Sequence, residues 1–240
     1  LRVVLYVFGP KLARESGGAT ILAWMAVATI LISSLIALKK DNLKARLAFS
    51  TIGQLSYIVL GIAILSPLST AGALYHLVAH AFMKITLFMC AGAIFVTTHK
   101  KDISEMVGLG RRMPITMSAF TIASLGIAGF PFFVGFVSKA NIIMGALKTG
   151  QLLFGATLIV SAVLALTYLM PVVLITFKRE PMNPEFNAYG EASKTMLVPL
   201  LITATVSVLL GVAPNFGLHL LDLAMSTGEA VFAHTGGVIC

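Results

Sequence analysis

The sequence predicts an all-α polytopic membrane protein, and three observations lead to this prediction. Hydrophobic residues make up 58% of the 240 residues, charged residues only 11%, and the mean hydropathy is +0.97. Soluble domains carry about 25% charged residues, so a water-facing fold is excluded. The apolar residues form separate runs of roughly the 20 residues that a helix needs to cross the hydrocarbon core. Basic residues collect at the ends of these runs.

The apolar runs predict six full transmembrane helices and one remnant. The remnant is Leu1–Gly9. Because the chain begins with Leu, already inside an apolar run, we expect it to be the rear part of a longer protein, or a processed or split product. The full spans are expected at Thr20–Leu38, Leu47–Leu65, Ala71–Val96, Ile115–Leu147, Leu152–Phe177 and Thr195–Val212.

The fourth span, Ile115–Leu147, is too long for one straight crossing and contains Gly129 and Pro131. Proline removes a backbone donor and its ring clashes with the preceding turn, so we expect this helix to break near mid-depth. Broken helices expose half-helix ends that recur at ion and substrate sites in transporters. A proline kink without an ionic role is the alternative. Lys139, about two turns past the break, favours the functional interpretation.

The loops alternate in charge along the chain. Eleven basic residues lie on one side of the predicted membrane and three on the other. The positive-inside rule places the first side in the cytoplasm, so we expect a multi-pass protein of the prokaryotic inner membrane with its C-terminus outside. The net charge of +8 is therefore assigned to topology, and no nucleic-acid partner is expected. The eleven are Lys39, Lys40, Lys44, Arg46, Lys100, Lys101, Arg111, Arg112, Lys178, Arg179 and Lys194; the three are Lys11, Arg14 and Lys148.

Four ionisable side chains lie inside predicted spans. His76, His80 and Lys84 are spaced at i, i+4 and i+8, so they share one helix face over about 12 Å. Lys139 lies in the broken span. A charge at bilayer depth costs about 2.5 kcal/mol or more, so such residues are functional candidates by default. Since histidine exchanges protons near neutral pH, the pattern predicts a proton path that water molecules complete. Tyr75, Thr86 and Ser56 are candidates to hold those waters.

All nine carboxylates lie in predicted loops or in the C-terminal tail. A lysine in the membrane interior normally pairs or faces water, so these lysines lack an acidic partner at depth within the chain. One solution is that they are neutral much of the time, because burial disfavours the charged form. The other is that a carboxylate arrives from another chain or from a missing front part. Either solution suits a relay that passes protons.

Other interpretations of these residues remain open. His76 and His80 have the spacing of two metal ligands, but no Cys, Asp or Glu lies at their depth and no second span carries an axial histidine. We therefore expect no metal and no cofactor. Lys44, at the start of a span, is a candidate for the place where protons enter from the cytoplasm; topology or snorkelling is the alternative.

Residues 1–213 are expected to form the transmembrane domain that carries this proton path. Residues 214–240 are expected to form a tail on the outer side. Within the tail, Leu218–Phe232 places apolar residues among Asp222 and Glu229, which predicts an interfacial amphipathic helix.

Three stretches resemble the rear half of the antiporter-like membrane subunit family. They are DNLKARLAFSTIGQLSYIVLG, YHLVAHAFMKITLFMCAGAIF and GIAGFPFFVGFVSKANII. The family includes the large subunits of Mrp-type cation/proton antiporters, and among these the chain is most similar to the D-like type. It also includes proton-pumping subunits of complex I and of membrane-bound hydrogenases. The resemblance implies a fourteen-helix fold with two inverted five-helix repeats, of which this chain holds the second, and a discontinuous twelfth helix.

The resemblance also implies roles for individual residues. Lys139 matches the ionisable residue of the broken helix, which exchanges protons with the outer side. His76, His80 and Lys84 match the eleventh-helix residues that pass protons along the central axis. The family's fifth-helix glutamate and its seventh- and eighth-helix lysines would lie before Leu1, so a partner segment is expected to supply them. The sequence GFPFF replaces a smaller, proline-rich stretch, which predicts a narrower or drier gap near Lys139.

The function implied is proton translocation within a multisubunit complex, together with other antiporter-like and small membrane subunits. Lysine at position 139, where one complex I subunit type has glutamate, favours Mrp-type Na⁺/H⁺ antiport. The alternatives are a proton-pumping subunit of a redox complex and a truncated, non-conducting scaffold. The chain shows no redox or hydrolytic motif of its own, so whether it belongs to an enzyme is left open.

Overall fold

The structure, a computed structural model, describes residues 2–178 and 184–233, and helices dominate these ranges. Leu1 of the predicted remnant and residues 234–240 of the predicted tail lie outside the described residues. The helices are η1 (Val3–Phe8), α1 (Gly9–Glu15), α2 (Gly18–Lys39), α3 (Leu43–Ala63), α4 (Pro67–Thr98), η2 (Ile103–Met106), α5 (Leu109–Arg112), α6 (Pro114–Ala128), α7 (Val134–Lys148), α8 (Leu152–Thr176), η3 (Pro184–Asn187), α9 (Lys194–Val212) and α10 (Leu220–Ala233).

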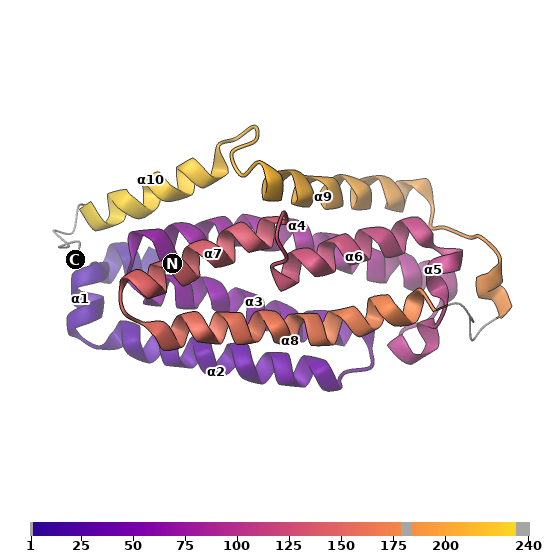
Figure 1. Ribbon diagram of the computed structural model, residues 1–240, viewed down its shortest axis with the longest axis horizontal. Coiled ribbons are helices and arrows are strands. Elements are labelled where there is room, and N and C mark those ends of the chain that lie inside the picture. The colour runs from indigo at the N-terminus through magenta and orange to yellow at the C-terminus, as the bar shows by residue number, and fades with distance from the viewer. Residues whose placement is uncertain (1, 179–183, 234–240) are drawn as a thin grey trace.

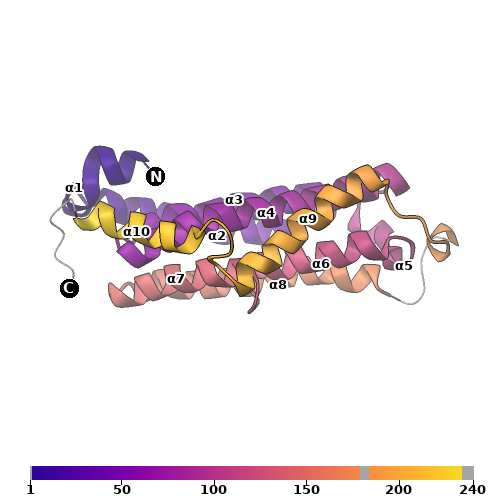
Figure 2. The same ribbon diagram turned by 90° about the horizontal axis from the view of Figure 1, so that it is seen from above.

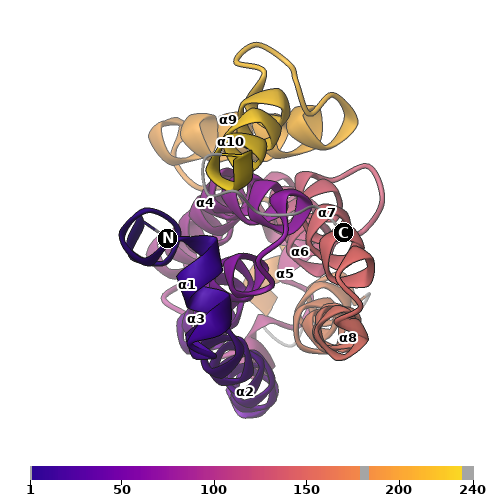
Figure 3. The same cartoon turned by 90° about the vertical axis from the view of Figure 1, so that its left-hand side faces the viewer.

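The long helices form an elongated bundle around α4 (Figure 1). This helix packs against α3, α6, α7, α9 and α10. Seen along the bundle, α9 and α10 form a layer on one side of α4, while α2, α3 and α8 lie on the opposite side (Figure 3). Buried apolar side chains such as Met83, Leu87 and Phe120 fill the space between these helices. The residues of α4 are therefore screened from lipid on most sides.

Five helices are long and apolar enough to cross a membrane, namely α2, α3, α4, α8 and α9. The all-α membrane fold predicted from composition is thus confirmed. Most predicted boundaries lie within a residue or two of the helix ends, but α3 and α4 each begin about one turn earlier than predicted. The third span is longer than the expected Ala71–Val96, because Pro67 begins α4 and the helix continues for 32 residues. The second begins at Leu43 rather than Leu47, because the Asn42 side chain accepts a hydrogen bond from the Ala45 amide and caps the helix there.

The predicted long span Ile115–Leu147 consists of two helices of 15 residues each, α6 and α7. They lie almost in line and are joined by a short loop (Figures 1 and 2). Gly129 ends α6 with a φ of 85°, a left-handed conformation that favours glycine. Phe132 also has a positive φ, 71°. The break lies where Gly129 and Pro131 predict it.

Glycines bring α4 and α7 into close contact. A Cβ atom added at Gly72 of α4 would lie 2.8 Å from the Ile142 amide nitrogen. One added at Gly145 of α7 would lie 2.6 Å from the Ser69 amide nitrogen. Small residues let helix backbones approach closely in membranes. The contact fixes the second half of the broken helix against α4, beside the histidines.

The loops that carry most of the basic residues lie together at one end of the bundle. The Leu43 amide donates to the Lys101 carbonyl oxygen over 3.1 Å, and the Gly190 amide donates to that of Arg112 over 2.9 Å. These bonds join segments that are far apart in the sequence. The grouping agrees with the sequence-based prediction that these loops share one side.

The C-terminal helix α10 runs lengthwise along the first half of α4 (Figure 1). The two backbones approach closely where Gly228 lies over Pro67 and Ala71. The predicted amphipathic segment is therefore helical from Leu220 to Ala233. Its location at a membrane interface stays a prediction. At the other end of the chain, the predicted remnant forms the π-helical turn η1, with Tyr6, Val7 and Phe8 exposed.

Candidate functional site

The four ionisable residues predicted within the membrane are buried in the bundle. His76 is 0% exposed, His80 8%, Lys84 5% and Lys139 4%. The rings of His76 and His80 stack with their centroids 6.2 Å apart, as expected for one helix face. The structure therefore places three of the four along α4 and brings Lys139 close to them from α7.

Helix α3 supplies a second row of polar side chains that faces the first. Ser50 contacts Lys84 at one level, and Gly61 lies against Ala73 at another, which fixes the antiparallel register of α3 and α4. Four residues on from Ser50, this register places Gln54 opposite His80. The ring of Tyr57 stacks on the ring of His76, with 5.6 Å between centroids. We call these residues, Ser50, Gln54 and Tyr57, the α3 row.

The α3 row was not predicted from the sequence, because its members are neutral. A serine, a glutamine and a tyrosine can be buried in a membrane at a much lower free-energy cost than a charged lysine, so they do not stand out in an apolar helix. Their spacing of four and three residues on one helix face was the signal that could have found them. All three are buried, with exposed fractions of 0–2%.

Lys84 is solvated by neutral oxygen atoms. Its Nζ donates to Ser50 Oγ over 2.8 Å and to the Leu47 carbonyl oxygen over 3.1 Å. Ser50 Oγ lies 2.8 Å from the Tyr168 hydroxyl of α8, and either oxygen can donate. Tyr168 therefore belongs to the Lys84 network.

His76 is oriented by α7. Its Nδ1 lies 2.8 Å from Ser138 Oγ, while the same hydroxyl donates to the Gly135 carbonyl oxygen over 3.0 Å. Because a serine hydroxyl has one proton, we assign Nδ1–H as the donor to Ser138. The other ring nitrogen, Nε2, is then the unprotonated one that can accept a proton. Ser138 thus selects the tautomer of His76.

Lys139 finds its partner at the helix break. Its Nζ donates to the Ile127 carbonyl oxygen over 2.5 Å and lies 4.9 Å from the centroid of the Tyr57 ring. The Ile127 carbonyl is one of the last of α6, where carbonyl groups lack helical partners and the helix dipole is negative. A Cβ at Gly129 would lie 2.9 Å from Lys139 Cδ. The break therefore supplies both an acceptor and the space for this lysine.

Three polar atoms on the facing sides of α3 and α4 have no hydrogen-bond partner among the described side chains or backbone. They are Gln54 Oε1, His76 Nε2 and His80 Nε2. Buried polar groups of this kind normally bond to water when protein does not reach them. Protein groups alone therefore do not connect His76, His80 and Lys84. Water is the natural bridge between them.

Lys44 is exposed, and its Nζ lies 4.7 Å from the centroid of the Phe95 ring. The buried cation at this end is instead Arg46, whose Nε donates to the Lys40 carbonyl oxygen over 2.8 Å. Its Nη1 donates to the Tyr168 carbonyl oxygen over 2.9 Å. The structure therefore brings Arg46, and not Lys44, next to the Lys84 network.

The three hydroxyls suggested as water holders bond to the backbone. Tyr75 donates to the Leu210 carbonyl oxygen over 2.7 Å, and Ser56 and Thr86 donate to carbonyl oxygens four residues earlier in their own helices. They do not extend the row of partnerless atoms. The hydroxyl proton of each residue is thus already bonded to a carbonyl oxygen, and their role in holding water stays a prediction.

That GFPFF gives a narrower or drier gap near Lys139 stays a prediction, but two of its three phenylalanine side chains are exposed. Phe130 is 50% exposed and Phe132 is 74% exposed. The left-handed backbone at Gly129 and Phe132 turns both rings away from the bundle. The space beside Lys139 is lined instead by Tyr57 and by the end of α6.

Among the described residues, the ion pairs are Lys100–Glu105 and His219–Asp222, and both lie outside the spans. The same ranges contain no group of three His, Cys, Asp or Glu side chains that could hold a metal ion. Within the described ranges, His76, His80, Lys84 and Lys139 therefore form no ion pair with an acidic side chain. This chemistry suits proton transfer and offers no ligand set for a metal.

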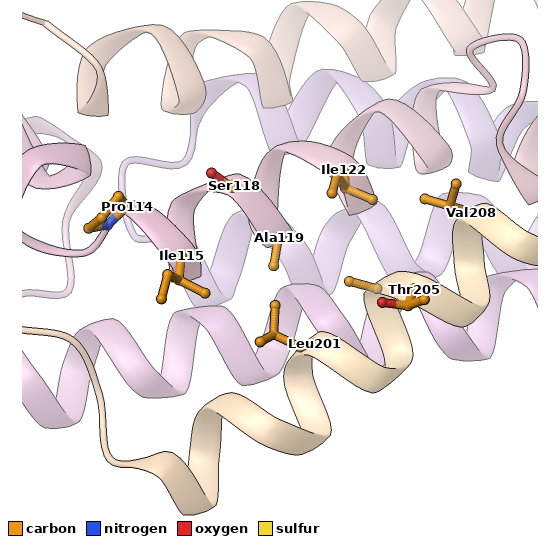
Figure 4. Close-up of a pocket in the computed structure, with 9 residues that line it drawn as sticks. Pro114, Ile115, Ser118, Ala119, Ile122, Leu201, Thr205 and Val208 are labelled. Carbon is orange, nitrogen blue, oxygen red and sulfur yellow. The ribbon is translucent and has the colours of Figure 1, made fainter.

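An apolar groove of about 480 Å³ lies elsewhere, between α6 and α9 (Figure 4). Ile115, Ile122, Leu201 and Val208 are among its lining residues. None of the ionisable residues of the row lines it. The groove is therefore separate from the candidate proton path.

The protein family described as NADH:quinone oxidoreductase/Mrp antiporter, TM, matches residues 4–167. NADH-quinone oxidoreductase subunit N of Desulforudis audaxviator is 34% identical over 219 residues, which are 87% of this chain and 44% of that protein. Subunit L of the Mycobacterium tuberculosis enzyme is 38% identical over 188 residues, 76% of this chain and 29% of that protein. The chain thus spans less than half the length of these relatives.

Two solved structures share the fold. A chain of the Mrp complex from Dietzia sp. superposes with a TM-score of 0.84 at 23% identity, covering 93% of this chain and 49% of that one. A chain of respiratory complex I from Thermus thermophilus superposes with a TM-score of 0.81 at 22% identity, covering 95% and 49%. The helix arrangement and the buried lysines agree with the family match over residues 4–167. The chain therefore belongs to the NADH:quinone oxidoreductase/Mrp antiporter transmembrane family.

Proposed function

We propose that the chain is the proton-translocating part of an antiporter-like subunit in a multisubunit membrane complex. In this proposal α2, α3, α4, the broken pair α6–α7, α8 and α9 make six membrane crossings. They form the second inverted repeat of a fourteen-helix fold, and residues 1–213 hold the proton path. A coverage of 49% of the superposed Mrp and complex I chains supports this division.

The observation that carries the proposal is a pair of buried lysines, each held by neutral oxygen atoms, with two histidines between them. Lys84 Nζ donates hydrogen bonds to Ser50 Oγ and the Leu47 carbonyl oxygen. Lys139 Nζ donates to the Ile127 carbonyl oxygen. A lysine without a fixed carboxylate partner can exist in both charge states, because neither state leaves a buried counter-charge stranded. Such groups can take up and release protons during a transport cycle.

The proposed path runs along the face of α4 toward the broken helix. Protons move between Lys84, His80 and His76 through bridging waters, and they exchange with the outer side near Lys139. Nε2 of His76 is the accepting atom, because Ser138 holds Nδ1–H. Lys44 remains a candidate for proton uptake from the cytoplasm, at the basic end of the bundle. Charge changes on residues supplied by a partner segment, a glutamate and lysines, drive the transfer.

We assign the basic end of the bundle to the cytoplasm and the α10 end to the outer side of a prokaryotic inner membrane. Residues 214–240 then form the outer-side tail, in which α10 packs along the first half of α4. Other antiporter-like and small membrane subunits are the partners, and protons and Na⁺ are the transported ions.

In the preferred version of the proposal, proton entry drives Na⁺ export, as in an Mrp-type antiporter. Lys139 and the likeness to the Dietzia sp. Mrp chain favour this version. A redox-driven pump is the second candidate, favoured by relatives that are subunits of NADH-quinone oxidoreductases. The two differ in a simple measurement: proton movement that requires Na⁺ and no electron donor supports the first, and movement that requires NADH or another donor supports the second.

Alanine variants of the two lysines test the proposal in membrane vesicles that contain the whole complex. Lys84→Ala and Lys139→Ala each remove a proton-exchanging group, so we expect proton uptake to fall at least tenfold, with the amount of assembled complex unchanged. Lys148→Ala is the matched control, because Lys148 is an exposed lysine at the end of α7. Uptake at the wild-type rate in both variants would exclude the relay and favour a non-conducting scaffold.

A further inference from the structure

Three side chains from three helices form a continuous row of hydrogen bonds at one end of the proposed path. Lys84 Nζ of α4 is 2.8 Å from Ser50 Oγ of α3, and Ser50 Oγ is 2.8 Å from the Tyr168 hydroxyl of α8. Ser50 and Tyr168 are each 2% exposed, so their hydroxyl groups have little access to bulk water as a hydrogen-bond partner. Their bonding depends on one another.

A hydroxyl group both donates and accepts, so this row can run in two directions. When Lys84 carries an ammonium, Nζ donates to Ser50 Oγ, and the Ser50 hydroxyl donates to the Tyr168 oxygen. When Lys84 carries an amine, the Tyr168 hydroxyl donates to Ser50 Oγ, and the Ser50 hydroxyl donates to the Nζ lone pair. Only the two hydroxyl hydrogens rotate between these states; no heavy atom moves and no proton leaves Ser50 or Tyr168.

Tyr168 is held in place for this role by its own backbone. Arg46 Nη1 donates to the Tyr168 carbonyl oxygen over 2.9 Å, while Arg46 Nε donates to the Lys40 carbonyl oxygen over 2.8 Å. The guanidinium is a planar fork that binds two acceptors in fixed directions. It therefore ties α8 to the start of α3, one turn from Ser50, and sets the position of the tyrosine ring.

The charged and titratable groups that face Lys84 are few. His80 lies one turn before Lys84 on α4, and Lys139 of α7 is close enough to act on it through its charge. Tyr168 of α8 and Arg46 of α3 belong to the same hydrogen-bond network, whereas Tyr57 lies further along α3, against His76. Helix α6 has no ionisable residue, and Lys194 of α9 and both acids of α10 are exposed. None of these groups on the described helices is a carboxylate at the depth of Lys84. A change in the charge of Lys84 is therefore accommodated by the hydroxyl groups of Ser50 and Tyr168.

We propose that Ser50 and Tyr168 are positioning residues that form a reversible hydroxyl pair, which bonds to Lys84 in both of its charge states. The pair takes the place that a carboxylate has in a salt bridge, but it favours neither charge state strongly. Lys84 Nζ then keeps Ser50 as a hydrogen-bond partner whether it gains or loses a proton. A buried Nζ left without a partner would add to the free-energy cost of the transfer. This inference rests on the proposed function, because in that function Lys84 takes up and releases protons.

The test compares Tyr168→Phe with Tyr75→Phe in vesicles that contain the whole complex. Both changes remove one buried phenolic hydroxyl, but that of Tyr75 bonds to the Leu210 carbonyl on α9, away from the lysines. We expect Tyr168→Phe to slow proton uptake about tenfold, because Ser50 loses the hydroxyl group that completes its hydrogen bonding beside Lys84. We also expect it to move the pH of half-maximal uptake by about one unit. Tyr75→Phe is expected to leave that pH unchanged.

Ser50 gives an independent arm. Ser50→Ala is expected to slow uptake and move the pH profile as Tyr168→Phe does, and Ser50→Thr, which keeps a hydroxyl, is expected to restore both. Wild-type rates and pH profiles in Tyr168→Phe and Ser50→Ala, with uptake lost in Lys84→Ala, would overturn the hydroxyl pair and leave the proposed function standing. Slower uptake with an unmoved pH profile, matched by Tyr75→Phe, would also overturn it. Full uptake in Lys84→Ala would instead refute the proposed function itself.

Discussion

Ser138→Ala removes the hydroxyl that orients His76 while leaving every other side chain of the row in place. Ser138 is 0% exposed, and its Oγ lies 2.8 Å from His76 Nδ1. The histidine is also fully buried. In the variant, Nδ1–H loses the Ser138 hydroxyl that accepts its hydrogen bond. A buried polar group left without a partner costs about 1–3 kcal/mol.

That cost acts on the tautomer of His76 and hence on transport. With Ser138 present, Nδ1–H is fixed and Nε2 is free to accept a proton. Without it, the tautomer with the proton on Nε2 becomes competitive, and that form cannot accept a proton at Nε2, the ring nitrogen that has no protein partner among the described residues. If the free-energy difference of about 1–3 kcal/mol is lost entirely from the transfer step, uptake falls by about 5- to 150-fold.

The assay is initial proton uptake into vesicles that contain the assembled complex, at equal amounts of complex. Ser124→Ala is the matched control, because Ser124 is a buried serine on the neighbouring helix α6 and its hydroxyl has no hydrogen-bond partner among the described residues. We expect that control to transport at close to the wild-type rate. Equal uptake by Ser138→Ala and Ser124→Ala would refute the assignment of the His76 tautomer and the role given to Nε2.

Two further predictions concern packing and the buried arginine. Gly135→Ala places a Cβ against the Gly126 carbonyl group at the contact of α7 and α6, so we expect about 1–3 kcal/mol of destabilisation and a lower melting temperature of the purified complex. Gly92→Ala, on a part of α4 with open space around it, is the control and is expected to be neutral or slightly stabilising; equal melting temperatures for the two variants would contradict the packing argument. Arg46→Lys keeps the charge but cannot bind both carbonyl groups in the same geometry, so proton uptake is expected to fall severalfold, whereas wild-type uptake would show that the charge alone suffices.

Local features of the sequence determined the membrane fold, the loops that share a side and the place of the helix break. Each follows from short-range rules. Apolar runs of sufficient length cross a membrane, and a glycine beside a proline ends a helix. The common face of His76, His80 and Lys84 follows from the helical period alone.

Only the tertiary structure decided how the lysines are solvated. Ser50 and Tyr168 are 118 positions apart in the chain, and neither carries a charge or a pattern that links it to Lys84. The partner of Lys139 is a backbone carbonyl at the end of α6, a group that every residue possesses. The sequence places all nine carboxylates outside the predicted spans. The packing of α3, α7 and α8 around α4 replaces an acidic partner with hydroxyl and carbonyl oxygens, because contacts between distant helices depend on register and close approach, which no local pattern encodes.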